Sequence, residues 1–346
     1  MLAIGALLLA GAGAVFCVTQ TYWLLVLAAT IGVISPSGNE VGPFLSIEQA
    51  ALAHIVGDGE RTAVFARYHL AGSVATALGA LVAGSVVSGL QGSGWSPLTS
   101  FRVLIAFYAG LGVVLAGLFT RLTPAVELPR AGGVERRAPV RLGLHQSTRV
   151  VLKLSSLFAL DAFGGGFVVQ SIVVYWFYLR FGAVPSTLGA IFFGANLLAG
   201  ASALAAVPLA RRIGLIRTMV FTHIPSNILL MLVPVMPTLP LSIAVFLLRC
   251  SISQMDVPTR QSYVMAVVAP DERSAASAVT GVARTAGAAV SPSLAGACLA
   301  VPALVGLPFL LAGALKATYD VLLWRGFRAV GPPEERPEAA PRASGR

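Results

Sequence analysis

The sequence contains two copies of one segment. Residues 48–84 and residues 260–296 align without a gap at a constant offset of 212 positions. The matched pairs are Gln49 with Gln261, Val56 with Val268, Glu60-Arg61 with Glu272-Arg273, Ala63 with Ala275, Ala66 with Ala278, Ala71 with Ala283, and Ala83-Gly84 with Ala295-Gly296. Chance identity between alanine-rich stretches is the alternative, but the polar residues keep the register too. A repeat with this period in an apolar chain indicates a membrane protein built from two similar halves.

The composition indicates that this chain spans a lipid membrane. Hydrophobic residues make up 56% and charged residues 11% of the sequence, and the mean hydropathy is +0.83, whereas a soluble domain carries about 25% charged residues. Apolar runs of about 18 to 28 residues can cross about 30 Å of hydrocarbon as helices. Only helices or closed barrels satisfy the backbone there, and the runs lack the period-two alternation of a barrel. We therefore predict an all-α, polytopic helical bundle.

The distribution of charge predicts the topology of this bundle. Ten spans are expected, at 2–19, 22–45, 66–88, 101–120, 152–178, 185–208, 216–236, 240–266, 275–299 and 304–325. Arginines gather in alternate loops and in the C-terminal tail, and positively charged loops stay in the cytoplasm. Aromatic residues cluster at the opposite ends, as an interfacial belt would: Tyr22, Trp23, Trp95, Tyr175, Trp176 and Tyr178. The net charge of +10 is thus a topology signal rather than a nucleic-acid surface, and both termini are predicted to be cytoplasmic.

One long internal loop divides the chain. We predict an incomplete N-terminal half of four helices at 1–121, a cytoplasmic loop rich in Arg, Pro and Gly at 122–150, and a six-helix C-terminal half at 151–326. Residues 327–346 contain Pro, Glu and Arg without apolar periodicity, and are predicted to form a disordered cytoplasmic tail.

The repeat, the span count and the charge pattern together resemble the major facilitator superfamily, whose members have twelve helices in two six-helix bundles. The segment Pro208–Gly214 is similar to the loop signature of that family, which has an Asp-Arg-x-Gly core. Arg212 and Gly214 match this core, whereas Arg211 stands where the Asp would be. The resemblance implies a two-half architecture, with four spans in one half and six in the other.

The same offset predicts that two helices are missing. Met1 aligns with Ile213, so the first two spans of the second half have no counterpart before Met1. They correspond to about 60 residues, at about 20 per span plus loops. A true start further upstream, a truncated gene and a native ten-helix protein are the alternatives.

Small residues recur every four positions in two of the predicted spans, at equivalent places in the repeat: Ala71, Ala75, Gly79 and Ala83, and Ala283, Gly287, Ser291 and Ala295. Such stripes let helix backbones approach closely in lipid, where no hydrophobic effect drives helices together. Close helix packing is therefore expected along both stripes.

Ionisable side chains inside the spans are the candidate substrate or coupling residues, because each costs about 2.5–3.5 kcal/mol on insertion scales. Arg249, Asp256 and Arg260 are spaced to share one stripe of a continuous helix. Asp161 lies about ten residues inside its span, near mid-membrane. We expect Asp161 to be the proton carrier, because its own span has no arginine to hold it ionised, whereas Asp256 is expected to be held by Arg249 and Arg260.

The remaining candidates are Glu40, Glu48 and Gln170. The alternative for some of these charges is a purely structural ion pair, which we weigh equally for Arg260, Glu48 and Arg284 because they lie nearer the inner surface. His223 is interpreted as a packed polar residue.

Enzyme signatures are absent from the sequence. It has no GxxxxGK[ST] loop, no HExxH and no cysteine pair at metal spacing, so no enzyme activity, cofactor or metal is predicted. The resemblance implies a monomeric secondary transporter of a small solute across the cytoplasmic membrane by alternating access, driven by a proton gradient, with solute and lipid as its partners. A truncated, non-transporting membrane protein or a membrane receptor is the alternative.

The arginine pattern gives a testable topology. Reporter fusions after Arg137 and after Arg346 are both expected to report a cytoplasmic location, because each position follows a cluster of arginines. A fusion after Trp95 serves as the control and is expected to report the opposite side. An external signal from either of the first two fusions contradicts this topology.

Overall fold

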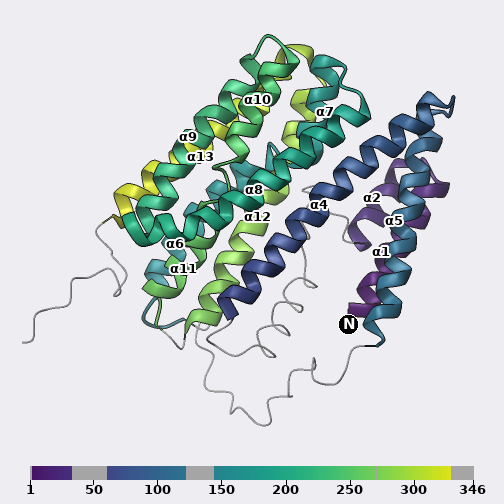
Figure 1. Cartoon of the computed structure of the whole chain (residues 1–346). Helices are drawn as coiled ribbons and strands as arrows, with labels where there is room; N and C mark the ends of the chain where they lie inside the picture. The colour runs from purple at the N-terminus through teal and green to yellow at the C-terminus, as the bar shows by residue number, and fades with distance from the viewer. Residues whose placement is uncertain (1, 33–60, 122–143, 270–271, 329–346) are drawn as a thin grey trace, which may run out of the picture. The chain divides into compact units, whose positions relative to one another are not determined.

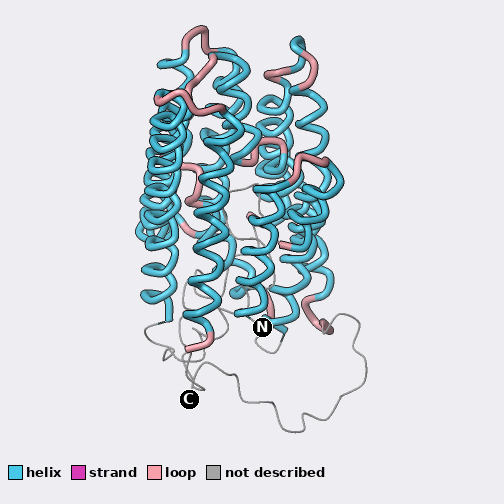
Figure 2. The backbone as a smooth tube through the Cα atoms, turned by 90° about the vertical axis from the view of Figure 1, so that its right-hand side faces the viewer, coloured by secondary structure: helices cyan, strands magenta, loops and turns pink. Residues whose placement is uncertain are grey.

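The computed structural model describes residues 2–32, 61–121, 144–269 and 272–328. The regular structure within these ranges is helical throughout (Figures 1 and 2). The helices are α1 (Leu2–Val18), α2 (Tyr22–Ile31), α4 (Arg61–Gly92), α5 (Pro97–Phe119), α6 (Thr148–Gly166), α7 (Gln170–Phe181), α8 (Pro185–Ile213), α9 (Leu215–Leu232), η3 (Val233–Val235), α10 (Leu239–Cys250), α11 (Asp256–Val267), α12 (Arg273–Leu299), η5 (Pro302–Leu304) and α13 (Leu307–Phe327). The predicted all-α class is confirmed.

Six described helical segments are long and apolar enough to cross a membrane. They are Leu70–Gly92, Pro97–Phe119, Thr148–Phe181, Pro185–Ile213, Leu215–Val235 and Pro302–Phe327. Three shorter apolar helices cover Ala3–Val18, Tyr22–Ile31 and Leu239–Cys250. The protein is a multi-pass membrane protein, whereas the predicted number of ten spans is not confirmed.

Two predicted spans are each broken into two helices, which corrects the sequence analysis. The span predicted at 152–178 consists of α6 and α7, with residues 167–169 between them directly after Gly164-Gly165-Gly166. Glycine costs about 1 kcal/mol per residue in a helix relative to alanine, so three in a row weaken the helix where it ends.

The span predicted at 240–266 consists of α10 and α11, separated by residues 251–255. Two serine hydroxyls near the break donate to backbone carbonyls, Ser251 Oγ to Leu248 O at 2.7 Å and Ser253 Oγ to Cys250 O at 3.3 Å. Such bonds offer the backbone an alternative to the helix ladder. A hydropathy pattern does not register them.

The described chain falls into two compact units, which we treat separately. Unit 1 spans Met1–Val134 and Phe177–Phe193, and unit 2 spans Glu135–Trp176 and Gly194–Arg346. The division into halves around the loop at 122–150 stays a prediction.

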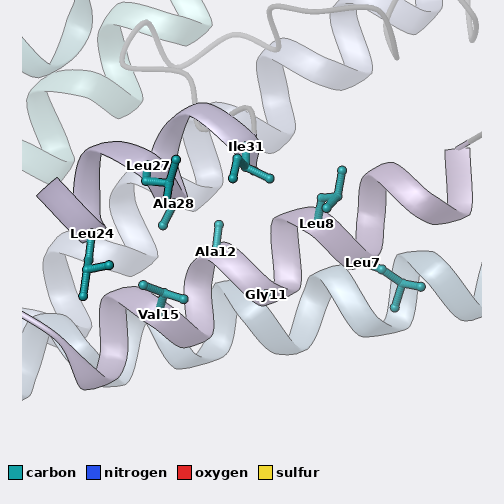
Figure 3. A pocket seen from close by; sticks show the side chains of 10 residues that line it. Leu7, Leu8, Gly11, Ala12, Val15, Leu24, Leu27, Ala28 and Ile31 are labelled. Atoms are coloured by element: carbon teal, nitrogen blue, oxygen red, sulfur yellow. The ribbon is translucent and has the colours of Figure 1, made fainter.

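Unit 1 is held by glycine contacts between helices. A Cβ atom at Gly112 of α5 would lie 3.0 Å from Ala10 N of α1, and one at Gly189 of α8 would lie 2.7 Å from Ala80 O of α4. Close backbone approach of this kind is how helices associate in lipid. An apolar groove between α1 and α2 is lined by side chains such as Leu24, Leu27 and Ile31 (Figure 3). The described residues that line this groove are all apolar.

Unit 2 packs α6 against α12 and α13, and α13 lies beside α9 (Figure 1). Its apolar core includes Leu154 and Phe158 of α6, Met219 of α9, and Tyr319 and Leu323 of α13, all of them buried. Trp176 is also buried, with its ring centroid 4.7 Å from that of Phe309. This is a correction, because Trp176 was predicted to lie in an interfacial belt; its neighbours Tyr175 and Tyr178 are exposed.

The small-residue stripe of α12 gives close packing at Gly287. A Cβ atom there would lie 2.9 Å from Ala159 C and 3.0 Å from Ala159 Cα of α6. The equivalent stripe of α4 does not repeat this contact at Gly79, where nothing lies within 4 Å of an added Cβ atom. Ala159 is two residues before Asp161, so the α6–α12 contact also fixes the depth of that carboxylate.

Two of the glycines of α12 provide a matched test. Gly287→Ala is expected to destabilise the protein by about 1–3 kcal/mol, because the backbone of α6 cannot yield as a side chain could. Gly281→Ala in the same helix meets nothing within 4 Å, so a gain of about 0.5–1 kcal/mol from helix propensity is expected. Thermal unfolding of the purified variants in detergent measures both. If the two variants have the same unfolding temperature, the packing argument at Gly287 is wrong.

Candidate functional site

Asp161 of α6 lies at the centre of a buried charge cluster. Its Oδ1 accepts from Lys316 Nζ of α13 at 2.6 Å, and its Oδ2 accepts from Arg284 of α12 at 3.2 Å and Arg260 of α11 at 3.4 Å. The residue is 2% exposed. One carboxylate therefore bonds to cations from three other helices. We call this set, with the further residues described below, the Asp161 cluster: Asp161, His223, Asn227, Asp256, Arg260, Arg284, Lys316 and Asp320.

Arg260 connects Asp161 to a second acid. Its Nη1 donates to Asp256 Oδ2 at 2.7 Å, four residues earlier in α11. Asp256 is the first residue of α11, where a negative charge interacts favourably with the helix dipole. The guanidinium also stacks over the ring of Phe158, 5.6 Å from the centroid.

Arg249 does not share the stripe predicted for it. It lies in the last turn of α10, and the break at 251–255 removes the helical register that would align it with Asp256. No ion pair joins Arg249 to Asp256 within the part of the chain that the structure describes. The expectation that two arginines hold Asp256 therefore reduces to Arg260 alone.

The other predicted residues contribute less to the geometry. Gln170 is half-buried at the start of α7, and no described hydrogen bond links it to the cluster. Glu40 and Glu48 lie outside the described residues. Their roles stay predictions.

A buried polar group on α9 and α13 extends the cluster. His223 Nδ1 lies 2.8 Å from Asp320 Oδ1, and Asn227 Nδ2 donates to Asp320 Oδ2 at 2.9 Å. His223 Nε2 lies 4.0 Å from Asp161 Oδ1. From the sequence, His223 was predicted to be a packed polar residue, and Asn227, Lys316 and Asp320 were not among the candidate residues. Lys316 and Asp320 had a usable signal, since both are charged and four residues apart inside an apolar run.

The charges of the Asp161 cluster balance. By formal charge, three carboxylates, Asp161, Asp256 and Asp320, match three permanent cations, Arg260, Arg284 and Lys316, and Asp320 itself pairs with His223. Buried ions are tolerated where partners offset the loss of water, and removing one partner costs about 3–5 kcal/mol. Adding or removing one proton therefore leaves an uncompensated buried charge. Among the residues described, no three His, Cys, Asp or Glu side chains are arranged to bind a metal.

A separate clamp fixes the N-terminus of α6. The Glu272 carboxylate, before α12, accepts from the backbone N–H groups of His145, Gln146 and Ser147, the last at 2.8 Å. Ser147 Oγ accepts from Ala269 N at 3.1 Å. Burial alone would raise the pKa of Glu272, but the hydrogen bonds from Ser147 and from the backbone N–H groups lower it to about 2. Glu272 thus ties the helix that carries Asp161 to the start of α12.

The helical fold and the buried charges are those of a polytopic membrane protein, and they are typical of the class of membrane-transport proteins. The family model of the Major Facilitator Superfamily matches residues 1–292. The chain belongs to this superfamily.

Known proteins resemble this chain in sequence or in fold. The uncharacterized membrane protein YJR124C of Saccharomyces cerevisiae is 29% identical over 339 residues, covering 90% of this chain and 75% of that protein. A bacterial homolog of the human lysosomal transporter Spinster, in an inward-facing and occupied conformation, matches with a TM-score of 0.67 at 13% identity, over 95% of this chain and 82% of the other. A bacterial homologue of the iron transporter ferroportin, in an inward-facing state, matches with a TM-score of 0.64 at 13% identity. The match covers 93% of this chain and 80% of that protein.

The human organic anion transporter MFSD10 gives a TM-score of 0.55 at 17% identity, over 93% of this chain and 76% of that protein. At these identities the solved structures establish the fold alone. The family and its neighbours indicate membrane transport rather than enzyme activity.

The clamp predicts a pH-dependent stability. The folded pKa of Glu272 lies below its ordinary value of 4.5, at about 2, so its contribution is present above about pH 4.5 and is lost as the pH falls toward about 2. Glu272→Gln is expected to lower the unfolding temperature at neutral pH, and this deficit is expected to shrink on acidification. Glu338→Gln, which removes the same charge from the predicted tail, is the control. A deficit that stays constant down to pH 2 contradicts the role of the carboxylate charge.

Proposed function

We propose that the protein is a proton-coupled secondary transporter that moves a small solute by alternating access, with Asp161 as the residue that exchanges the coupling proton. The observation that carries this proposal is the set of three cations from α11, α12 and α13 on one buried carboxylate. These cations overturn the reason first given for choosing Asp161, because they hold its carboxylate ionised, so it can take up a proton only where the contacts loosen. Packing alone does not require a charge at this position, and a charged group inside a span is costly.

Protonation of Asp161 gives a physical link between a proton and the arrangement of the helices. The neutral acid no longer compensates Lys316, Arg260 and Arg284, so the attraction between α6 and three other helices weakens. A ligand or proton shifts a conformational equilibrium when it interacts differently with the two states. A cluster that is balanced in one protonation state and carries an excess positive charge in the other meets this condition.

Arg284 is the proposed point of solute contact. It keeps 34% of its side chain exposed, whereas the side chains of Arg260, Lys316 and Asp161 are exposed by 8%, 11% and 3%. An anionic or zwitterionic group of a solute would compete there with Asp161. The organic anion transporter among the structural neighbours is consistent with such a solute but does not identify it.

The remaining parts of the proposal follow from the sequence. We propose that the protein is a monomer in the cytoplasmic membrane, with both termini inside, and that its partners are the solute and lipid. Binding of nucleic acid is not expected. The arginine distribution supports the orientation.

Transport by the complete chain of residues 1–346 in liposomes tests the proposal. A panel of anionic, zwitterionic and amphipathic compounds is offered under an imposed pH gradient. Asp161→Asn is expected to reduce gradient-driven accumulation by at least about 100-fold, the lower end of the effect of losing a positioned proton-transfer group. The variant is first checked for folding, because it leaves buried cations unpaired.

Glu272→Gln is the matched control. It removes another buried carboxylate that holds α6 but lies outside the Asp161 cluster, so gradient-driven accumulation is expected to persist. Normal accumulation by Asp161→Asn removes Asp161 from the mechanism. A wild-type chain that transports no compound under any gradient favours the alternative of a non-transporting membrane protein.

A further inference from the structure

His223 joins two buried carboxylates that belong to different helices. Its Nδ1 lies 2.8 Å from Asp320 Oδ1 of α13, and its Nε2 points to Asp161 Oδ1 of α6 at 4.0 Å. His223 and Asp320 are 4% and 0% exposed. The imidazole therefore has one acid at each nitrogen, and neither nitrogen faces bulk water.

The first contact is a complete hydrogen bond and the second is not. A neutral imidazole carries a proton on one nitrogen and a lone pair on the other. An ionised Asp320 carboxylate only accepts, so Nδ1 carries the proton in this contact, and the second carboxylate oxygen accepts from Asn227 Nδ2. Asn227 Nδ2 also lies 3.3 Å from Nδ1. With the proton on Nδ1, the lone pair of Nε2 is directed at Asp161, about 1 Å beyond hydrogen-bond distance.

We propose that His223 and Asp320 form a second proton-binding site, and that His223 transfers a proton between Asp161 and Asp320. This inference rests on the proposed proton coupling for its physiological purpose. In the forward step the O–H bond of protonated Asp161 breaks and an N–H bond forms at Nε2. The proton on Nδ1 then passes to Asp320 Oδ1, so that the N–H bond at Nδ1 breaks and an O–H bond forms. The net result is one proton moved from Asp161 to Asp320, with the imidazole left as its Nε2–H tautomer, which must return to the Nδ1–H form before the next transfer.

The same geometry makes the transfer dependent on conformation. Lys316 Nζ holds Asp161 Oδ1 at 2.6 Å, which occupies the oxygen that Nε2 needs. The transfer requires α9 and α6 to approach by about 1 Å while Lys316 withdraws. Pro225 in α9, two residues after His223, removes one backbone hydrogen bond from that helix. A proline-weakened helix can bend, which gives α9 a means of making this approach.

The groups around His223 come from each packed helix. α13 supplies Asp320, Lys316 and Tyr319, whose ring is 6.0 Å from the imidazole centroid to centroid, and α6 supplies Asp161. The charged groups of α11 and α12 lie on the side of Asp161 rather than of His223. Arg260 and Arg284 contact Asp161 directly, and Asp256 contacts Arg260. Among the described residues of α10, none forms an ion pair with His223. Both acids within reach can stabilise an imidazolium, and Lys316 opposes it.

The protonation of His223 can be measured without any solute. The complete chain, labelled with ¹⁵N-histidine and placed in lipid nanodiscs, is followed by NMR between about pH 5 and 8, the range in which histidine ordinarily titrates. The sequence has four histidines, and the signal absent from His223→Gln is that of His223. We expect this signal to change from the form protonated at Nδ1 to the doubly protonated form. A signal that stays in one neutral form over the whole range overturns the proposal.

Carboxylate variants test the coupling to both acids. Asp320→Asn and Asp161→Asn are each expected to displace the titration midpoint of His223 by about tenfold or more in proton concentration, because each removes a carboxylate next to the ring. Asp256→Asn removes a carboxylate of the same cluster that does not contact His223, so the midpoint is expected to move less than in either of the other two variants. Equal displacement in all three variants overturns the assignment, since it would reflect a general loss of packing.

The outcome is separable from that of the transport experiment. If Asp161→Asn does not fold, the wild-type titration and the comparison of Asp320→Asn with Asp256→Asn decide the question. A titrating His223 in a protein that moves no solute supports the second proton site and contradicts proton-coupled transport. Proton-driven transport with an invariant His223 signal supports proton-coupled transport and contradicts the second proton site.

Discussion

The attraction between the Asp161 carboxylate and three cations is the interaction on which unit 2 depends. Lys316, Arg284 and Arg260 come from α13, α12 and α11, so their contacts on one carboxylate orient three helices around α6. An apolar core that includes Phe158, Met219 and Tyr319 packs beside these contacts, and only Arg284 keeps a substantial part of its side chain, 34%, exposed. Burial makes the charges strong partners for one another and makes each of them costly to leave alone. The clamp at Glu272 and the close contact at Gly287 tie α6 to the start and the middle of α12.

The fold class and the centre of the site could be predicted from the sequence. The apolar runs gave the all-α membrane class, and the cost of a charge in a span identified Asp161, Asp256 and Arg260. The same cost applied to the last span would have identified Lys316 and Asp320. Pairing could not be predicted, because the partners of Asp161 are 99, 123 and 155 positions away and are selected by helix packing. His223 appeared unimportant because its two acids lie on other helices.

Continuity of helices was the main error of the sequence analysis. Hydropathy averages over a window and does not register where backbone hydrogen bonds are diverted, so α10–α11 was expected to be one continuous helix. The break before α11 has a consequence for the site. It places Asp256 at a helix start, where the backbone N–H groups favour its charge, and it separates Arg249 from the other charges of the cluster. The glycine triplet after Asp161 ends α6 five residues beyond the carboxylate, so this buried charge lies close to a point where the chain can bend.

The balance of three acids against three permanent bases limits how this protein can evolve. Loss of a single partner leaves a buried ion uncompensated, whereas loss of an acid together with a base leaves none. Neutral drift at these positions is therefore expected to proceed by paired substitutions, or through an intermediate in which a neighbouring base has already been replaced. A descendant that has lost the acid at position 161 is expected to have lost one of the bases at positions 260, 284 and 316 as well. The first of the two losses is expected to be the one whose intermediate is destabilised less.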